Sequence, residues 1–285
     1  MKKYKLKAFC KANLSLRILK KNNDDYHTIQ SFVSFCDLYD EIFLSKNNKK
    51  KDKISFYGKF KTGINANKNT ITKTLHLLRK EKILVNKNFT IKIKKNIPHS
   101  SGLGGGSANA ASLLSFFLKK KDLNVKKSRL YKIARLIGED VALSLENKTL
   151  YLTGKKIKIL KLRERLNLLI IFPNILCLTK KIYSRNRKFS LSNPLPSDVL
   201  VKKNKLIFFL INEHNDLEKT VIQMYPKVAN LLKNISIQKG CYFSRLTGSG
   251  SACIGLFSNI KTALNAKKII KKKFPNYWCS VSQTV

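Results

Sequence analysis

The sequence predicts a globular protein that combines β-strands with α-helices. Its 285 residues suffice for one large domain or two moderate ones. Hydrophobic residues make up 43% of the chain, enough for a buried core, which excludes a wholly disordered chain. Apolar residues alternate at the amino terminus, as in a strand, and recur every three to four residues in several later segments, as in helices.

The amino-terminal half is predicted to begin with a strand. Residues 4–18 alternate so that the even positions form a buried face. Lys11 and Asn13 then share the polar face, about 7 Å apart. The other elements expected here are strands over 28–35, 40–44 and 89–94, an exposed loop over 46–53 and a helix over 72–82.

The remainder of the chain is predicted to contain both element types. Ser128 is expected to cap one helix and Gly138 to end it. Asn215 and Glu218 have the spacing of a capping box at another helix start. The expected helices cover 110–118, 128–137 and 263–271, and the expected strands 141–145, 149–152, 166–172 and 253–257.

The chain carries a formal net charge of +42, from 58 Lys and Arg against 16 Asp and Glu. Such a charge attracts anions of every kind, nucleic acid included. The lysines are scattered, however, and the abundance of Lys, Asn and Ile is typical of drift toward AT-rich codons. We favour solvated surfaces over a selected nucleic-acid surface, and a basic RNA-binding protein remains the alternative.

The cysteines indicate the redox compartment, and the apolar segments predict no membrane span. Six cysteines occur without a C-x-x-C pair, which favours free thiols in a reducing cytosol. The amino terminus lacks an apolar block, so no signal peptide is expected. The most apolar stretch, 166–178, is too short to span a bilayer and contains Pro173. A cytoplasmic protein without a membrane partner is expected.

A glycine-rich loop lies between a predicted strand and a predicted helix. It reads Pro98, His99, Ser100, Ser101, Gly102, Leu103, Gly104, Gly105, Gly106, Ser107, Ala108. Glycines let the backbone approach a ligand closely, and the helix amino terminus presents N–H groups to phosphate. The loop lacks the Gly-Lys-Ser/Thr of a Walker A motif and the third glycine of the dinucleotide fingerprint. A flexible glycine linker is the weaker alternative, because a linker needs no flanking strand and helix.

The run from residue 98 to 111 resembles the ATP-binding motif of the galactokinase, homoserine kinase, mevalonate kinase and phosphomevalonate kinase superfamily, the GHMP kinases. Six further motifs, in order, are similar to those of the 4-diphosphocytidyl-2-C-methyl-D-erythritol kinases. They are Cys10-Lys11-Ala12-Asn13-Leu14, Asp24-Asp25-Tyr26-His27, Gly138-Glu139-Asp140-Val141, Thr179-Lys180-Lys181, Asn215 to Glu218, and Thr247-Gly248-Ser249-Gly250-Ser251. The resemblance covers nearly the whole chain.

The chain departs from the family pattern at five positions without losing a reactive group. Ala12 replaces Ile, Asp25 replaces Gly, Glu139 replaces Ala, Ala142 replaces Pro, and Ala108 stands where a second Ser is frequent. Asp25 lies in the turn that presents Tyr26, and Glu139 places a carboxylate beside Asp140. Both replacements are expected to affect the affinity for substrate.

The resemblance implies an α+β, two-lobed GHMP kinase fold. Its amino-terminal lobe is similar to the ribosomal-protein-like β-α-β domain, and its carboxy-terminal lobe is an α/β sandwich. The expected domains are 1–158, which binds ATP, and 159–285. The implied reaction moves a phosphoryl group from ATP to the 2-hydroxyl of a cytidine diphosphate substrate, 4-diphosphocytidyl-2-C-methyl-D-erythritol, in non-mevalonate isoprenoid biosynthesis. Another GHMP kinase, an inactive descendant and the RNA-binding protein are the alternatives. A monomer or weak homodimer is expected.

The resemblance also assigns the catalytic pair. Asp140 is the expected general base on the acceptor hydroxyl, and Lys11 is expected to keep it ionised and to favour the developing alkoxide. Without the family, Asp140 would be an ordinary turn residue, and Lys11 a solvated strand lysine like Lys5 or Lys7.

Substrate contacts are assigned in the same way. Tyr26 is expected to stack on cytosine and His27 to contact its polar edge; a core Tyr and a turn His are the alternative. Asn13 and Thr179 are expected to bind substrate. The turn Gly248, Ser249, Gly250 is expected beside the phosphates, with a plain hairpin turn as the alternative. Mg²⁺ is the expected metal, with Ser107 as a candidate ligand and no full set of ligands identified.

Overall fold

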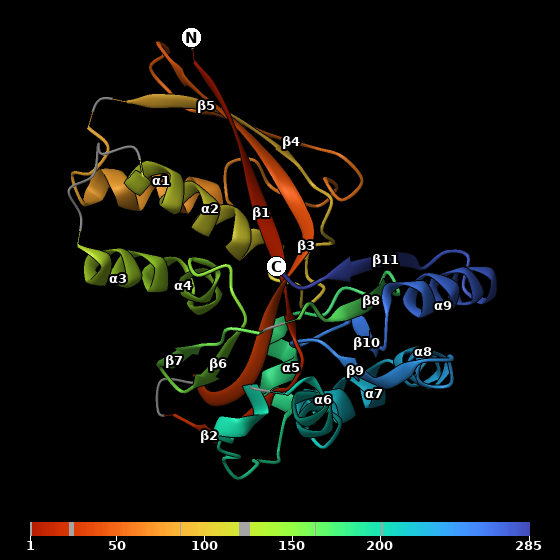
Figure 1. Ribbon diagram of the computed structural model, residues 1–285. Coiled ribbons are helices and arrows are strands. Elements are labelled where there is room, and N and C mark those ends of the chain that lie inside the picture. Colours follow the sequence, from red (N-terminus) through yellow and green to blue (C-terminus); the bar gives the residue numbers. More distant parts are fainter. Residues whose placement is uncertain (1, 23–25, 86, 120–125, 163, 201) are drawn as a thin grey trace. The chain divides into compact units, whose positions relative to one another are not determined.

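A computed structural model describes residues 2–22, 26–85, 87–119, 126–162, 164–200 and 202–285 (Figure 1). The chain divides into two compact units built from interleaved segments. The first unit comprises residues 1–10, 38–99 and 104–147, and the second comprises 11–37, 100–103 and 148–285. Both units combine helices and sheets, which agrees with the expected α+β class. The predicted domain boundary after residue 158 stays a prediction.

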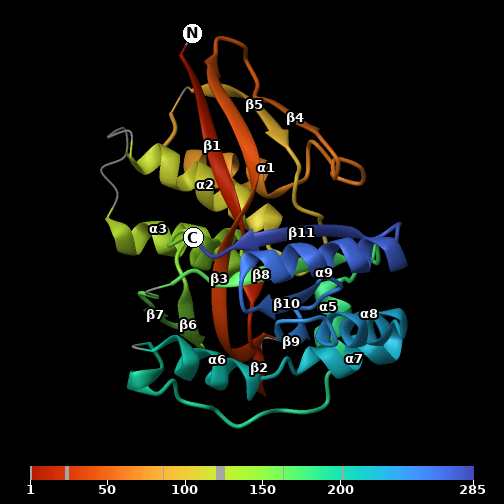
Figure 2. The same ribbon diagram turned by 45° about the vertical axis from the view of Figure 1, so that its right-hand side comes forward.

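The first unit places four helices on one face of a sheet (Figures 1 and 2). In the sheet, β5 lies between the antiparallel β3 and the parallel β4, and β1 pairs with β3. Strands β1 and β3 each run from one unit into the other. The elements are β1 (Lys3–Asn13), β3 (His27–Asn47), β4 (Lys53–Tyr57), β5 (Asn88–Lys94), α1 (Thr70–Lys80), α2 (Gly105–Lys119), α3 (Lys127–Ile137) and α4 (Glu139–Ser144).

The second unit contains a four-stranded antiparallel sheet in the order β11-β8-β10-β9. In the same unit the first part of β3 pairs with β2 and β6, and β6 pairs with β7. The strands are β2 (Arg17–Lys21), β6 (Leu150–Thr153), β7 (Lys156–Ile159), β8 (Asn167–Phe172), β9 (Cys241–Leu246), β10 (Cys253–Phe257) and β11 (Trp278–Gln283). The helices are α5 (Thr179–Arg185), a 3-10 turn (Ser197–Leu200), α6 (Lys203–Ile211), α7 (Leu217–Met224), α8 (Lys227–Ser236) and α9 (Ile260–Lys273).

Each unit has its own hydrophobic core. In the first, the apolar stripes of α1, α2 and α3 pack against alternate residues of β3 and β5. In the second, α7, α8 and α9 cover one face of the sheet with residues such as Val221, Leu231 and Ile270 (Figure 2). All six residues of β8 are buried. Among the described residues, no helix has both the length and the apolar character needed to cross a bilayer.

Most predicted elements are confirmed to within a few residues, and β10 matches to the residue. Three predictions about strands are wrong. The expected strand over 4–18 forms two strands, β1 and β2, and residues 14–16 belong to neither. The expected strands 28–35 and 40–44 form one strand, β3, since Asp37 does not end it but accepts hydrogen bonds from Ser282 and from the N–H of Gln283 in β11. The expected loop over 46–53 contains the end of β3 and the start of β4.

Three predictions are also wrong in the segments that form helices α3, α4 and α7. The expected strand 141–145 is the short helix α4, whose Ser144 hydroxyl donates to the carbonyl of Asp140 one turn earlier. Ser128 lies inside α3, whose cap is Lys126 without a side-chain bond, whereas Gly138 does end that helix. The N-cap of α7 is Asp216 rather than Asn215.

Candidate active site

The glycine loop ends inside a helix. α2 begins at Gly105, so Gly105, Gly106 and Ser107 form its first turn, where backbone N–H groups have no partner within the helix. Gly106 is exposed, and its carbonyl accepts a hydrogen bond from the Thr70 hydroxyl (2.8 Å). The helix end that follows β5 therefore presents donors suited to an anion, as predicted from the strand-loop-helix order.

The other part of the loop, residues 100–103, lies against the late glycine turn of the second unit. Ala252 N–H donates to the Ser101 carbonyl (3.0 Å), and Lys11 N–H donates to the Leu103 carbonyl (3.0 Å). Gly102 has a φ of +83°, and a Cβ on it would lie 2.1 Å from the Thr247 carbonyl oxygen. Only glycine allows the two loops this approach.

Lys11 and Asn13 lie at this junction, both buried, with 6% and 2% of their surface exposed. Lys11 Nζ donates to Asn13 Oδ1 (2.7 Å), and Asn13 N–H donates to the Thr247 hydroxyl (2.8 Å). Asn13 Nδ2 donates to Ser31 Oγ (2.8 Å), while the Ser31 hydroxyl donates to the Ser15 carbonyl. Ser31 thus fixes which end of the Asn13 amide faces Lys11, a role that the sequence did not reveal.

The late turn itself is supported by α7 and the residues before it. The buried Asn215 amide donates to the carbonyls of Leu246 (2.8 Å) and Gly248 (2.9 Å), and its oxygen accepts from Leu217 N–H (3.0 Å). The Glu218 carboxylate accepts from Leu246 N–H (2.8 Å), and burial raises the pKa of Glu218. The predicted capping pair therefore holds the glycine turn instead of closing a capping box.

Thr179, the first residue of α5, also reaches this turn. Its hydroxyl lies 2.9 Å from the Ser249 hydroxyl. The structure thus brings together nine of the predicted site residues within the second unit. They are Lys11, Asn13, Ser101, Gly102, Leu103, Thr179, Gly248, Ser249 and Gly250.

Asp140 occupies the first turn of α4 in the first unit, and not a loop after a helix as predicted. Its neighbour Glu139 is exposed, and its carboxylate lies 3.8 Å from Arg135 Nε one helical turn earlier. The departure at position 139 is therefore accommodated on the surface by an ion pair.

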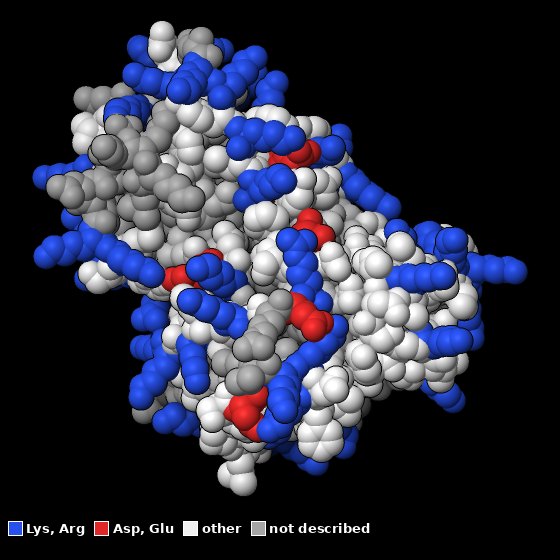
Figure 3. Space-filling view, viewed as in Figure 1, with Lys and Arg blue, Asp and Glu red and all other residues white. Residues whose placement is uncertain are grey.

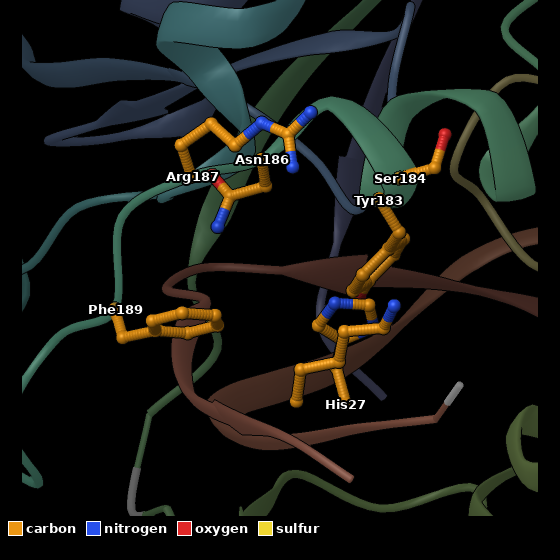
Figure 4. A pocket seen from close by; sticks show the side chains of 7 residues that line it. His27, Tyr183, Ser184, Asn186, Arg187 and Phe189 are labelled. Carbon is orange, nitrogen blue, oxygen red and sulfur yellow. The ribbon is translucent and has the colours of Figure 1, made fainter. Parts of the chain in front are cut away.

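A cavity of about 140 Å³ lies in the second unit beside His27 (Figure 4). The His27 and Tyr183 rings are 5.0 Å apart between centroids, and the Phe189 ring lies across from them. The seven lining residues are Lys21, His27, Tyr183, Ser184, Asn186, Arg187 and Phe189. Tyr183, Arg187 and Phe189 belong to none of the quoted motifs, although Tyr183 follows Thr179-Lys180-Lys181 by two residues, so sequence patterns did not single them out.

Tyr26 is 65% exposed and is not one of these lining residues. Its predicted stacking on cytosine stays a prediction, as does the contact predicted for His27. Asp24 and Asp25, which precede Tyr26, lie outside the described residues. Within the described ranges, no cluster of three or more His, Cys, Asp or Glu side chains is arranged to hold a metal ion.

Comparison with known proteins identifies the family. Residues 69–147 of the chain match the GHMP kinases N terminal domain, and residues 204–276 match the GHMP kinases C terminal domain. A 4-diphosphocytidyl-2-C-methyl-D-erythritol kinase of Pelagibacter ubique is 38% identical over 100% of both chains. One of Anaplasma marginale is 30% identical, covering 98% of this chain and 96% of the relative.

The chain belongs to the 4-diphosphocytidyl-2-C-methyl-D-erythritol kinase family. The recognised resemblance, the GHMP kinase fold and the expectation of a kinase are thereby confirmed. GHMP kinases are ATP-dependent, so ATP is the nucleotide that this family uses.

Solved structures agree with the fold of this 4-diphosphocytidyl-2-C-methyl-D-erythritol kinase family. A crystal structure of 4-(cytidine 5'-diphospho)-2C-methyl-D-erythritol kinase superposes with a TM-score of 0.79 at 22% identity, covering 99% of this chain and 100% of that one. A homoserine kinase from Cytophaga hutchinsonii gives 0.72 at 18% identity, covering 100% and 95%. At these identities the likeness concerns the fold alone.

Proposed function

We propose that this chain transfers the γ-phosphoryl group of ATP to the 2-hydroxyl of 4-diphosphocytidyl-2-C-methyl-D-erythritol, a step in non-mevalonate isoprenoid precursor synthesis. The family assignment supports the reaction. The observation within the structure that supports the acceptor is the arrangement along α5.

Helix α5 connects an aromatic pocket to the glycine turn. Thr179 contacts Ser249 of that turn, and Tyr183, four residues later, lines the pocket with His27. Residues four apart lie on the same helix face, about 6 Å apart along the axis. A flat base against the rings of the pocket, with Lys21 and Arg187 near its diphosphate, would extend its sugar alcohol toward the turn.

ATP is proposed to place its phosphates on the first turn of α2 and on the glycine residues beside it, at 102–106. These segments supply N–H donors and little side-chain bulk. Mg²⁺ fits a site of this kind, because it is held mainly by nucleotide phosphates and needs few protein oxygens, of which the Ser107 hydroxyl is one. When bound, the ion neutralises charge on the phosphates.

Asp140 is proposed to accept the proton of the attacking 2-hydroxyl, and Lys11 to stabilise the negative charge that develops. Asn13 holds the Lys11 ammonium through its amide oxygen. Unlike Lys5 and Lys7 on the same strand, Lys11 is buried, so solvation alone does not account for its position.

The catalytic roles are tested by ADP release with the cytidine substrate. Asp140→Asn and Lys11→Ala are each expected to lower kcat by about a hundredfold or more, the usual size of a general-base or charge-stabilising contribution. Lys7 is an exposed lysine on the same face of β1. Lys7→Ala is therefore the matched control and should keep wild-type turnover. Turnover indifferent to both catalytic changes would refute the mechanism.

The acceptor is tested separately. Phe189→Ala and Tyr183→Ala are expected to raise KM for the cytidine substrate without changing KM for ATP. Mevalonate and homoserine, offered as acceptors, should give no turnover; efficient turnover of either would favour another GHMP kinase activity.

We also propose a cytoplasmic location, which fits the six cysteines observed as free thiols, and a monomer or weak homodimer.

A further inference from the structure

A buried polar cluster lies beneath the first turns of α2 in the first unit. It consists of Asp40 on β3, Lys95 directly after β5 and Asn109 on α2, which are 0%, 2% and 2% exposed. None of these residues belongs to the proposed catalytic or substrate-binding set. A charged pair so deeply buried requires a complete set of partners.

The three side chains satisfy one another. Lys95 Nζ forms an ion pair with Asp40 and donates to Asn109 Oδ1 (2.9 Å). Asn109 Nδ2 donates to Asp40 Oδ2 (2.9 Å). The second Asp40 oxygen accepts from two backbone N–H groups, those of Asn96 (2.7 Å) and Ile97 (2.9 Å).

These bonds hold the two ends of the glycine loop. Asn96 and Ile97 directly precede Pro98, where the loop begins, and Asn109 follows Ala108, where it ends. Gly105 packs tightly on the same cluster, since a Cβ there would lie 3.0 Å from the Ile97 side chain and 3.5 Å from Lys95 Nζ. One carboxylate thus joins the entry of the loop to the helix at its exit.

Stability alone is a weak reason for such a cluster. Replacing a buried ion pair by apolar side chains of similar size is often neutral or stabilising, because two charges must be desolvated. Hydrogen bonds with fixed directions instead define a geometry, here the spacing between the backbone at 96–97 and the first turns of α2. That spacing decides where the loop N–H groups point.

We propose that Asp40, Lys95 and Asn109 are positioning residues for ATP, which set the glycine loop in the shape that its phosphates require. The inference rests on the proposed function, because it takes ATP as the ligand of this loop. Because its side chains are buried, the cluster is inferred to act through the loop, so its loss should weaken nucleotide binding and leave acceptor binding unchanged.

The test uses Asn109→Leu, which keeps the Asp40–Lys95 pair and the shape of the side chain but removes the link to α2. Its dissociation constant for ATP, measured calorimetrically without acceptor, should rise about tenfold to a hundredfold, the range expected when binding groups are misplaced by up to about 1 Å. KM for ATP should rise in parallel, whereas KM for the cytidine substrate should stay at the wild-type value.

Asn234→Leu is the matched control, since Asn234 is also a buried helical asparagine but its amide donates to Asn230 within the same helix, α8. It should bind ATP as the wild type does. Wild-type ATP affinity in Asn109→Leu would overturn the proposal, as would an equal rise of both KM values.

A second variant covers the case in which Asn109→Leu fails to fold. Asp40→Asn alone should weaken ATP binding, and adding Asn109→Asp should restore part of it, since the exchange returns a carboxylate to Lys95. Equal ATP affinity in the single and double variants would refute the proposal. A wild-type protein that binds no ATP would instead refute the proposed function, and the two failures are therefore distinguishable.

Discussion

At the scale of single residues, burial separates groups that look alike in the sequence. Lys5, Lys7 and Lys11 occupy equivalent positions in the alternation of β1, yet Lys5 and Lys7 are exposed and Lys11 is buried. Lys5 is paired with Glu41 on the surface, whereas Lys11 donates to the Asn13 amide. Alternation therefore predicted the strand correctly. The polar residues on the Lys11 face, however, suggested an exposed face, whereas Lys11 is buried.

Ser31 controls the orientation of Asn13. Because its hydroxyl donates to the Ser15 carbonyl, it can only accept from Asn13 Nδ2, which turns Oδ1 toward Lys11. Ser31→Ala removes the acceptor, and the freed amide can then present its NH₂ group to the ammonium. We expect kcat to fall about tenfold, as for other small misplacements of a reacting group, with KM for ATP nearly unchanged.

The comparison variant is Ser34→Ala on the same strand, a buried serine bonded to the Thr149 hydroxyl instead of to Asn13. It should lose a similar amount of stability but retain kcat, and Ser31→Thr should recover much of the activity because its hydroxyl is kept. Full kcat in Ser31→Ala would show that the amide is oriented in another way.

At the scale of elements, periodicity located most helices and strands, but short segments were decided by their partners. The apolar run Val141 to Leu145 suits a strand by composition; it forms helix α4 because Val141, Ala142 and Leu143 are all buried and no strand partner is present among the described residues. Asn215 and Glu218 have the spacing of a capping box, but the Asn215 NH₂ group and the Glu218 carboxylate bond to the backbone of Leu246 in β9.

Glu218 gives the contact between α7 and β9 a pH dependence. Burial raises its pKa, and the bond from Leu246 N–H only partly opposes this. A carboxyl with a raised pKa in the folded state contributes stability below its ordinary pKa near 4.5, and this contribution is lost as pH rises through the folded value.

Glu218→Gln keeps an oxygen for Leu246 N–H and removes this titration. Relative to wild type, the variant should therefore gain in free energy of unfolding as pH rises from about 4 to 8. Urea unfolding of both proteins across this interval measures the difference. A difference that is constant with pH, or that shrinks as pH rises, would contradict the assignment to Glu218.

At the scale of the whole molecule, the net charge of +42 comes from cations that are scattered along the sequence. On the face shown in Figure 3, Lys and Arg side chains are spread over the surface with a few acidic residues between them. A dedicated nucleic-acid surface would gather cations along one groove or helix. The formal charge of +42 is therefore expected to act as a general attraction for polyanions.

Binding of single-stranded RNA should accordingly be nonspecific and steeply dependent on salt. We expect the logarithm of the affinity to fall linearly with the logarithm of the salt concentration, with no preference among sequences, because only phosphates are contacted. Fluorescence anisotropy at several salt concentrations measures this slope. Tight binding of one RNA sequence that persists at about 0.5 M salt would point to a selected RNA surface.

The sequence by itself determined many of the elements, the glycine loop and the family, because periodicity and short motifs are local properties of the chain. The sequence also identified Lys11, Asn13 and the two glycine segments as candidate functional residues, but it did not indicate which residues hold them in position. The tertiary structure alone decided that Ser31 orients Asn13, that Asn215 and Glu218 hold the late turn, and that Tyr183 and Phe189 face His27. It also joined Asp40, Lys95 and Asn109 in one buried cluster. Hydrogen bonds and burial arise between residues far apart in the chain, and no local pattern records them.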